Sequence, residues 1–460
     1  MRLESTTHQK SGQLELPFCC KGEAPRAERS GEAPTASKGT ERSGNTTELL
    51  MEQVVQRNNL VAALKRVRRN KGSPGIDGMT VQELPAYLAQ NWPTLRASLL
   101  EGTYQPQPVR RQEIPKSGGG VRQLGIPCAL DRFIQQAILQ VLQPQWDPTF
   151  SEHSYGFRPG RRAHDAVCAA QKYIQEGRDW VVDVDLEKFF DRINHDVLMG
   201  RLAQRIADKR LLKLIRRYLE TGVMVDGVVV ERHEGSPQGG PLSPLLANVL
   251  LDEVDKELEK RGHAFCRYAD DCNVYVRSER AGNDVMQTLR RLFTDLRLRV
   301  NEAKSAVARP WERKFLGYTF WILKKTGELR RGIASKALKA MKERVRAITS
   351  RTGGRSISRV IEELRPYLLG WREYFRLQQQ ASLFSRLDGW IRHRLRMLQL
   401  KHWKNGPRAY RALRKLGLPE QDAAKVAGNL RSWWRNSHMA LNFALPPRYF
   451  DKLGLPRLDA

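Results

Sequence analysis

Three aspartates in this chain could hold divalent cations. Asp185 ends the apolar stretch WVVDVD (180–185), and Asp270 and Asp271 stand side by side in FCRYADDCNVYV (265–276). A buried carboxylate is costly unless a cation or hydrogen bonds compensate it. Mg²⁺ binds one or two carboxylates together with water and phosphate oxygens, and a pair of such ions suits in-line displacement at phosphorus. If the three acids converge, they predict a two-metal site for nucleotidyl transfer.

Two elements would have to position these acids. WVVDVD is predicted to be a short buried strand, in which the alternation of side chains places Asp183 and Asp185 on one face. FCRYADDCNVYV is predicted to be a hairpin with Asp270 and Asp271 at its turn, where side chains can project out of the sheet. Taken alone, an Asp-Asp pair in a turn is more often a solvated hairpin tip, so the rest of the sequence must decide.

The charge of the chain calls for a polyanionic partner. Its 460 residues include 79 Lys and Arg against 50 Asp and Glu, for a formal net charge of +29. Nucleic acid is the first choice of partner and an anionic membrane surface the second. No apolar run is long enough to span a membrane, and the N-terminus lacks the apolar core of a signal peptide. The six Cys form no CxxC pair, which is typical of reduced thiols in a cytosolic protein.

Composition and periodicity divide the chain. Residues 1–47 are rich in Ser, Thr, Glu, Gly and Lys, and we expect them to be disordered. From residue 48 helices alternate with strands, among them two short strands joined by a Gly-rich tip in 114–127 and a helix over roughly 280–298. After about residue 330 the apolar residues recur only at helical spacing, so an all-helical region is predicted there.

This helical region contains a basic stretch that suits RNA. Between Asp388 and Glu420 there is no acidic residue, while Trp390, Trp403 and Tyr410 are interleaved with bases. Bases neutralise phosphates, and aromatic rings stack on unpaired nucleotides. We predict RNA contacts for Arg392, Arg394, Arg396, Lys401, Lys404, Arg408 and Arg411; Arg414 and Lys415 complete the nine bases of the stretch.

Several sequence blocks resemble a known family. YADD (268–271), DLEKFFDRINH (185–195) and GSPQGGPLSPLLAN (235–248) resemble the palm of a reverse transcriptase, most closely of the group II intron-encoded class. The resemblance extends over roughly residues 48–445. Further blocks that match are RQLGIPCALDRFIQQAI (122–138), SYGFRPGRRAHDAV (154–167), NEAKSAV (301–307), KFLGYTF (314–320) and the maturase, or X-domain, block LLGWREYFR (368–376).

The resemblance implies an α+β chain with a right-hand polymerase fold. Fingers and palm, with an antiparallel palm sheet, would occupy 48–330, and an all-helical thumb and maturase (X) domain would occupy 331–425. Residues 426–460 would be a basic C-terminal tail. This tail contains no CxxC pair, so an HNH endonuclease is not expected.

The resemblance also assigns roles to residues. Asp185, Asp270 and Asp271 would be the catalytic metal ligands for two Mg²⁺ ions, with Mn²⁺ as a substitute, whereas Asp183 and Asp191 would be structural, the latter as an N-cap or in an ion pair. Phe190 would exclude the ribose 2′-hydroxyl, and its neighbour Phe189 would belong to the core. The other predicted nucleotide contacts are Lys116 and Arg122 at the triphosphate, Gln238 at the incoming nucleotide and Lys304 at the leaving pyrophosphate.

The function implied is that of an RNA-directed DNA polymerase that also binds its intron RNA and assists splicing and retrohoming. Its partners would be intron RNA, an RNA template with a DNA primer, target DNA and deoxynucleotides, in the bacterial cytoplasm at the nucleoid. Three alternatives remain: a reverse transcriptase domesticated for defence or repair, a non-enzymatic RNA-binding maturase, and an RNA-dependent RNA polymerase, which Phe190 disfavours. The sequence does not give the oligomeric state.

Overall fold

The computed structural model describes residues 49–115, 121–225, 228–230, 234–236, 239–438 and 440–459. The predicted tail 1–47, Lys116 and Gln238 therefore lie outside the described residues. The chain forms two compact units. The first comprises residues 1–162, 182–274 and 280–306, and the second comprises 163–181, 275–279 and 307–460.

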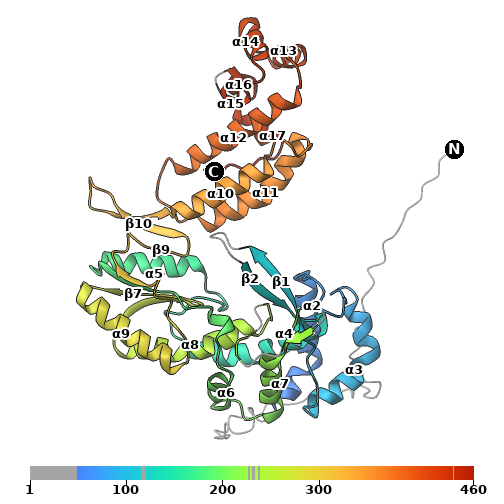
Figure 1. Cartoon of the computed structure of the whole chain (residues 1–460), viewed down its shortest axis with the longest axis vertical. Helices are drawn as coiled ribbons and strands as arrows, with labels where there is room; N and C mark the ends of the chain where they lie inside the picture. The colour runs from blue at the N-terminus through green and yellow to red at the C-terminus, as the bar shows by residue number, and fades with distance from the viewer. Residues whose placement is uncertain are drawn as a thin grey trace, which may run out of the picture. The chain divides into compact units, whose positions relative to one another are not determined.

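Helices make up most of the first unit, and their apolar faces form its core (Figure 1). Their bounds are α1 (Leu50–Val54), α2 (Arg57–Arg69), α3 (Leu84–Leu100), α4 (Ala129–Trp146), α6 (His195–Ala203), α7 (Lys209–Glu220), α8 (Ser243–Lys260) and α9 (Glu279–Asp295), with single 3₁₀ turns η1 (Asp147–Thr149) and η2 (Phe189–Asp191).

One sheet of the first unit contains the hairpin formed by β1 and β2. β1 (Val109–Pro115) pairs antiparallel with β2 (Val121–Ile126), as predicted for 114–127. On its other side β1 pairs parallel with β4 (Val223–Val225), which pairs with β5 (Val228–Val230). The base of β1 is tied to α4 by the buried Asp131, whose carboxylate accepts hydrogen bonds from the Tyr104 hydroxyl at 2.9 Å and the Gln107 N–H at 3.1 Å. Burial raises the pKa of Asp131 to about 6.

The second sheet contains the strands that carry the acids. β6 (Ala264–Tyr268) and β7 (Asp271–Val276) form the predicted hairpin, and β3 (Trp180–Val184) lies next to β7 in the order β6-β7-β3-β8, where β8 is Ala306–Ala308. Within β6 and β7 nearly every residue from Ala264 to Val274 is buried, because helices cover this sheet. The sheet and its covering helices confirm the predicted α+β class.

The second unit is mostly helical. It contains α5 (Ala163–Gln175) and a three-stranded sheet of β9 (Lys314–Phe315), β10 (Tyr318–Ile322) and β11 (Leu329–Ile333). From Ser335 onward the described elements are all helices, and α10, α11 and α12 lie side by side (Figure 1). They are α10 (Ser335–Ile348), α11 (Ile357–Tyr374), α12 (Leu383–His402), α13 (Gly406–Lys415), α14 (Glu420–Gly428), α15 (Trp433–Asn436), α16 (Ala440–Ala444) and α17 (Pro447–Lys452).

Two predicted boundaries differ from the structure. The boundary at residue 330 falls inside β11, because this strand continues the antiparallel pairing with β10 as far as Ile333. The segment 426–460, predicted to be a tail, is folded against α12. Asp388 of α12 accepts a hydrogen bond from the Leu458 N–H at 2.9 Å, and Arg392 forms an ion pair with Asp451 at 3.1 Å.

Two further observations bear on the sequence predictions. Among the described residues, no helix combines the length and the apolar character needed to cross a membrane. The four described cysteines, Cys128, Cys168, Cys266 and Cys272, are free thiols, as the sequence indicated.

Candidate active site

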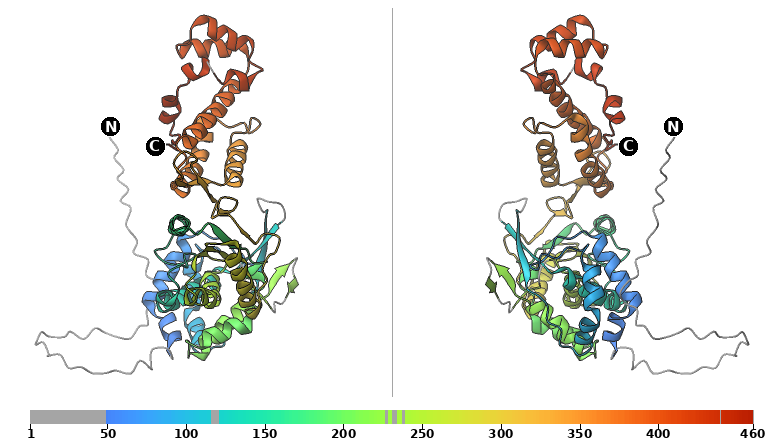
Figure 2. Two further views of the ribbon diagram at one scale, coloured as in Figure 1. Left: turned by 90° about the vertical axis from the view of Figure 1, so that its left-hand side faces the viewer. Right: turned by 90° about the vertical axis from the view of Figure 1, so that its right-hand side faces the viewer.

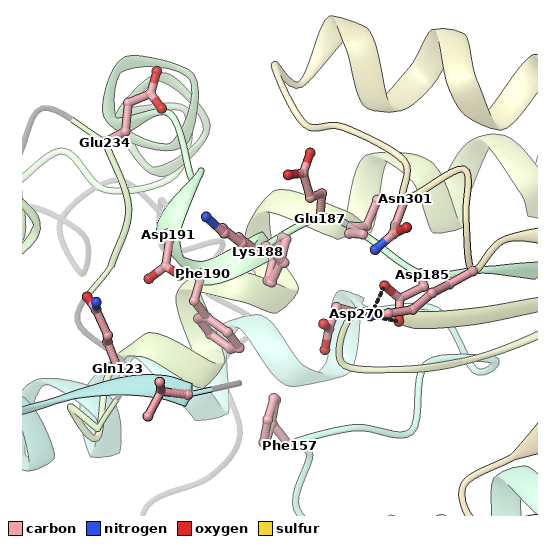
Figure 3. A pocket seen from close by; sticks show the side chains of 14 residues that line it. Gln123, Phe157, Asp185, Glu187, Lys188, Phe190, Asp191, Glu234, Asp270 and Asn301 are labelled. Carbon is pink, nitrogen blue, oxygen red and sulfur yellow. Dashed lines mark hydrogen bonds and ion pairs between the residues drawn. The ribbon is translucent and has the colours of Figure 1, made fainter. Parts of the chain in front are cut away.

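A cavity of about 850 Å³ in the first unit is lined by two of the three predicted carboxylates. Asp185 follows the last residue of β3, and Asp270 lies in the turn between β6 and β7. Figure 3 shows their side chains next to each other on one side of the cavity. The other lining residues are Val121, Gln123, Phe157, Leu186, Glu187, Lys188, Phe189, Phe190, Asp191, Glu234, Asn301 and Lys304.

The hairpin separates the roles of its two acids. Because β6 ends at Tyr268 and β7 begins at Asp271, the turn consists of Ala269 and Asp270 alone. Asp270 lines the cavity, whereas Asp271 is exposed and does not line it. In the described part of the chain no three His, Cys, Asp or Glu side chains form a group that could hold a metal. The structure therefore brings together Asp185 and Asp270 but not Asp271.

Asp185 is held by a segment that lies far away in the sequence. The Asn301 N–H donates to the Asp185 carbonyl at 2.8 Å, and the Asp185 N–H donates to the Ser305 hydroxyl at 3.0 Å. The Glu187 N–H donates to the Arg299 carbonyl at 2.8 Å. These contacts explain why Asn301 and the predicted site residue Lys304, both in the 299–305 segment, lie on the cavity wall.

A cation already faces the Asp185 carboxylate. The Lys304 ammonium lies 3.0 Å from Oδ1 and 3.3 Å from Oδ2 of Asp185. The Lys304 side chain is 63% exposed and that of Asp185 is 32% exposed, so this ion pair contributes little to stability. It shows instead that the carboxylate is open to a positive charge. Two carboxylates on a polar, open cavity fit the donor set that Mg²⁺ prefers when phosphate oxygens and water complete its shell.

Two other acids near the cavity have structural surroundings. Asp183, within β3, faces the buried Asn273 of β7, whose amide nitrogen in its favoured orientation lies 3.1 Å from Asp183 Oδ1. This contact agrees with the structural role predicted for Asp183. Asp191, which lines the cavity, was predicted to be an N-cap or part of an ion pair, and the first of these is wrong: Asn194 caps α6, since its side chain accepts a hydrogen bond from the Val197 N–H.

The two aromatic residues after Asp185 both line the cavity but differ in burial. Phe189 is only 2% exposed, which confirms its place in the core. Phe190 is half-buried on the cavity wall, in edge-to-face contact with Phe189 at a ring separation of 5.1 Å. Its backbone carbonyl accepts a hydrogen bond from the Ser236 N–H at 2.7 Å, which ties the backbone of Phe190 to Ser236.

The predicted triphosphate contacts are only partly described. Lys116, Gln238 and the side chain of Arg122 lie outside the described residues. The backbone of Arg122 is part of β2, and its neighbours Val121 and Gln123 line the cavity. The start of β2 therefore borders the same space as the two carboxylates.

Sequence reasoning missed Phe157 and Asn301 as cavity residues. Phe157 is 43% exposed and has a positive φ of 61°, an uncommon backbone conformation for a bulky residue. Both residues occur in blocks that carry the family resemblance, SYGFRPG and NEAKSAV. The resemblance therefore marked these segments but assigned no role to Phe157 or Asn301.

A second cavity of about 440 Å³ shares Phe157 with the first and is lined by α2, α4 and the residues before α8. Its polar lining residues are Arg66, Asn70, Arg132, Gln136 and Gln143. The loop NKGSPGIDG (70–78) borders this cavity through Asn70 and Gly72. The loop is pinned to α4, because the Arg132 guanidinium donates to the Ser73 carbonyl at 2.7 Å and leaves no room for a Cβ at Gly72.

The basic stretch in the second unit contains two kinds of arginine. Arg392 and Arg396 are 4% and 5% exposed, so the prediction that they contact RNA is wrong for this structure. Arg392 forms ion pairs with Asp388 and Asp451, and Arg396 donates to the Leu445 carbonyl at 3.0 Å. Burial lowers the pKa of Arg396 to about 10. Both guanidinium groups hold residues 440–459 against α12.

The remaining predicted RNA contacts differ in exposure. Arg394 is half-buried and donates to the Thr349 hydroxyl at 2.7 Å, and Lys401 is half-buried and donates to the Arg351 carbonyl. Lys404, Arg408 and Arg411 are exposed, and Arg408 and Arg411 belong to α13, which follows the C-terminal end of α12 (Figure 2). Of the predicted RNA contacts in this stretch, the exposed ones therefore lie on α13 and in the turn before it.

Comparison with known proteins identifies both regions. Residues 114–320 match the family model "Reverse transcriptase (RNA-dependent DNA polymerase)", and residues 338–417 match "Group II intron, maturase-specific domain". Protein YkfC of Escherichia coli (strain K12) is 34% identical over 300 residues, which cover 56% of this chain and 78% of YkfC. The chain belongs to the group II intron reverse transcriptase/maturase family.

Two other family members carry longer sequences. The group II intron-encoded protein LtrA of Lactococcus lactis subsp. cremoris is 36% identical over 195 residues, which cover 42% of this chain and 32% of LtrA. The COX1/OXI3 intron 2 protein of Saccharomyces cerevisiae is 31% identical over 234 residues, which cover 50% of this chain and 26% of that protein. The chain thus carries a reverse transcriptase domain and an intron maturase domain, as predicted, and spans about a third or less of the length of these two relatives.

Proposed function

We propose that this chain is an RNA-directed DNA polymerase that uses Mg²⁺, with Mn²⁺ as a substitute, and assists the splicing and retrohoming of its own intron. The observation that carries the proposal is one cavity that joins Asp185, Asp270, Phe190 and Lys304. A carboxylate pair, an aromatic ring and a lysine are the groups needed to hold cations, select a sugar and neutralise a leaving pyrophosphate. Reverse transcriptase domains in general use divalent metal ions, which agrees with this donor set.

Each cavity residue has a role in this proposal. Asp185 and Asp270 would hold Mg²⁺, which when bound lowers the pKa of the attacking hydroxyl and stabilises the leaving pyrophosphate. Asp271 would add negative charge at the start of β7, beside the cation site, and would be the third ligand. Lys304, released from Asp185 as the cations bind, donates a proton to the pyrophosphate oxygen. Phe190 contacts the sugar and excludes nucleotides that carry a 2′-hydroxyl.

The second cavity extends this proposal to the template. Its amides and guanidinium groups can bind bases and phosphates, and the exposed Phe157 ring offers a stacking surface between the two cavities. We place the unpaired template RNA along the 70–78 loop and α4 in this cavity. We place intron RNA on the exposed bases of α13. We propose that the protein acts in the bacterial cytoplasm, at the nucleoid.

The test is primer extension by the purified chain on poly(rA)/oligo(dT) with Mg²⁺. Asp270→Ala should abolish DNA synthesis and leave RNA binding, measured by filter retention, nearly intact. Asp295→Ala, which removes an exposed carboxylate at the end of α9, is the matched control and should polymerise like the unchanged chain. Comparable synthesis by Asp270→Ala would refute the metal-site assignment. An unchanged chain that binds RNA but extends no primer would support the alternative of a non-enzymatic maturase.

A further inference from the structure

Arg267 is a buried arginine two residues before the turn of the Asp270 hairpin. It lies in β6 and is only 1% exposed. Among the described residues it is the largest side chain that is fully buried. Its side chain is not part of the cavity wall, so the proposed chemistry does not use it directly. A charged side chain buried so deeply must find a partner for every donor it carries.

Arg267 meets this requirement with four different partners. Nε and Nη2 donate to the Asp255 carboxylate of α8, at 2.7 and 2.5 Å, and Nη2 also donates to the Ser154 hydroxyl at 2.7 Å. Nη1 donates to the Asn248 side-chain oxygen and to the Ala269 carbonyl, each at 3.0 Å. All three guanidinium nitrogens are thus engaged, and the fork spans a helix, a loop and the turn.

The ion pair with Asp255 keeps Arg267 charged. Burial by itself lowers the pKa of Arg267, but the attraction of the fully buried Asp255 outweighs it, and the pKa is raised above its ordinary value. A buried ion pair can often be replaced by apolar side chains without loss of stability. The stability of the sheet therefore does not explain why a guanidinium is placed here, whereas its directed hydrogen bonds do.

The hydrogen bond to Ala269 acts on the peptide that leads into Asp270. Ala269 has a φ of 58°, in the left-handed region that residues with a Cβ adopt only when their surroundings enforce it. The Ala269 carbonyl belongs to the planar peptide between Ala269 and Asp270, so holding this oxygen fixes the direction in which the Asp270 backbone begins. Arg267 Nη1 is the group that holds it.

The loop before Phe157 supports the turn from its other side. The Arg267 N–H donates to the His153 carbonyl at 2.9 Å, and the Tyr155 N–H donates to the Arg267 carbonyl at 2.8 Å. Gly156 packs so closely on the turn that a Cβ there would lie 2.2 Å from the Ala269 nitrogen. The Asn248 amide donates to the Gly156 carbonyl at 2.9 Å, so the residue that accepts from Arg267 also holds this loop in place.

We propose that Arg267 is a positioning residue for Asp270: by joining Asp255, Ser154 and the Ala269 carbonyl, it holds the two-residue turn in the conformation that points Asp270 into the cavity. This inference rests on the proposed function, since it assumes that Asp270 binds the catalytic cation. A lysine at this position could pair with Asp255, but its single nitrogen cannot reach the three other partners at the same time.

The test uses the purified full chain with Arg267→Lys and the same primer-extension assay. Because a misplacement of about 1 Å at a reacting group can cost about 100-fold in rate, kcat should fall by about 100-fold. The concentration of Mg²⁺ needed for half-maximal activity should rise, while the KM for dTTP stays unchanged. Mn²⁺ binding measured by electron paramagnetic resonance should weaken in the same variant, with no turnover required.

A matched control is Arg210→Lys, which breaks a guanidinium fork on the buried Asp208 and on Glu52, outside both cavities. It should lower the melting temperature without changing kcat or the Mg²⁺ dependence. If Arg267→Lys does not fold, Ser154→Ala removes a single partner and should still raise the Mg²⁺ requirement.

The outcomes separate the inference from the proposed function. Wild-type kcat and Mn²⁺ binding in Arg267→Lys, with Asp270→Ala inactive, would overturn the positioning role and leave the polymerase assignment standing. The positioning role would also be overturned if Arg210→Lys and Arg267→Lys had the same melting temperature and lost kcat equally. The loss of kcat would then follow from lower stability alone. A wild-type chain without DNA synthesis would overturn the proposed function and this inference with it.

Discussion

The acids of the cavity and the arginines of α12 are both clusters of like charge, but they differ in burial and in their partners. Asp185 and Asp270 stay half-buried on the wall of a cavity, and the first of them faces a lysine that is 63% exposed. Arg392 and Arg396 are buried and satisfied by Asp388, Asp451 and a backbone carbonyl.

The difference lies in what surrounds each charge. Asp185 directly follows strand β3, and Asp270 is the second residue of the turn after β6, so both lie where the chain leaves the sheet. The arginines sit within a 20-residue helix that packs against α15 and contacts Leu445 and Asp451. Cavity acids are therefore available to substrate, while helix arginines serve the packing of the second unit. Four predictions follow from this contrast.

The largest effect is expected on β3 itself. Asp185→Asn should reduce DNA synthesis by about 1,000-fold, because loss of a metal-binding charge removes electrostatic stabilisation of the transition state. Asp183→Asn, two residues earlier and in contact with Asn273, should cost tenfold or less by comparison, about 1 kcal/mol. Primer extension with both variants measures the difference. Equal losses would mean that the cavity does not distinguish the two acids.

A smaller effect is expected on RNA binding by the second unit. Replacing Lys404, Arg408 and Arg411 by Gln should change how RNA binding depends on salt. The slope of the logarithm of the RNA association constant against the logarithm of the salt concentration should become shallower by about 2, because each phosphate contact contributes about 0.7 on single strands. Arg396→Met should leave that slope unchanged and lower the melting temperature, because its contacts are to Leu445 and Phe450. A slope that responds only to Arg396→Met would reverse the assignment of exposed and buried bases.

The next smaller effect is expected on the choice between deoxyribonucleotides and ribonucleotides. Phe190→Ala should reduce the preference for dTTP over UTP by about tenfold or more, because removal of the ring opens space for the 2′-hydroxyl. Phe189→Ala should instead lower stability, since that ring is buried in the core. Competition assays with both nucleotides measure the preference, and unchanged selectivity in Phe190→Ala would reject its role.

The smallest effect concerns a carboxylate that is neither in the cavity nor paired with a base. Because the pKa of Asp131 is raised from 3.8 to about 6, its protonation stabilises the folded state below pH 4. That contribution is lost as pH rises through 6. Asp131→Asn should therefore flatten the pH dependence of the melting temperature between pH 4 and 6 by a few degrees. An identical pH profile in the variant would show that Asp131 is not protonated in the folded state.

Patterns of short range were predictable from the sequence. The hairpin at 265–276, the strand at 180–185 and the helices from Ser335 onward follow from alternation and helical spacing, which depend on neighbours in the chain. The family resemblance supplied the order of the domains and the roles of Asp185, Asp270 and Phe190. It could not show that Asp271 lies off the cavity wall, because this depends on a two-residue turn in which Ala269 alone takes up a positive φ.

Contacts between distant segments were not predictable. The burial of Arg392 and Arg396 depends on the folding of residues 440–459 against α12, and an acid-free stretch gives no sign of that partner. The cavity role of Asn301 likewise arises from pairing with Asp185, 116 positions earlier in the printed sequence.

This last pairing has a consequence for synthesis of the protein. A ribosome that has translated residue 271 has already produced all three acids, but not the 299–305 segment that holds Asp185 by its backbone and its carboxylate. Domains acquire their structure as the chain emerges from its N-terminus. The proposed active site therefore lacks the contacts that hold Asp185 until α9 and the segment after it have left the exit tunnel.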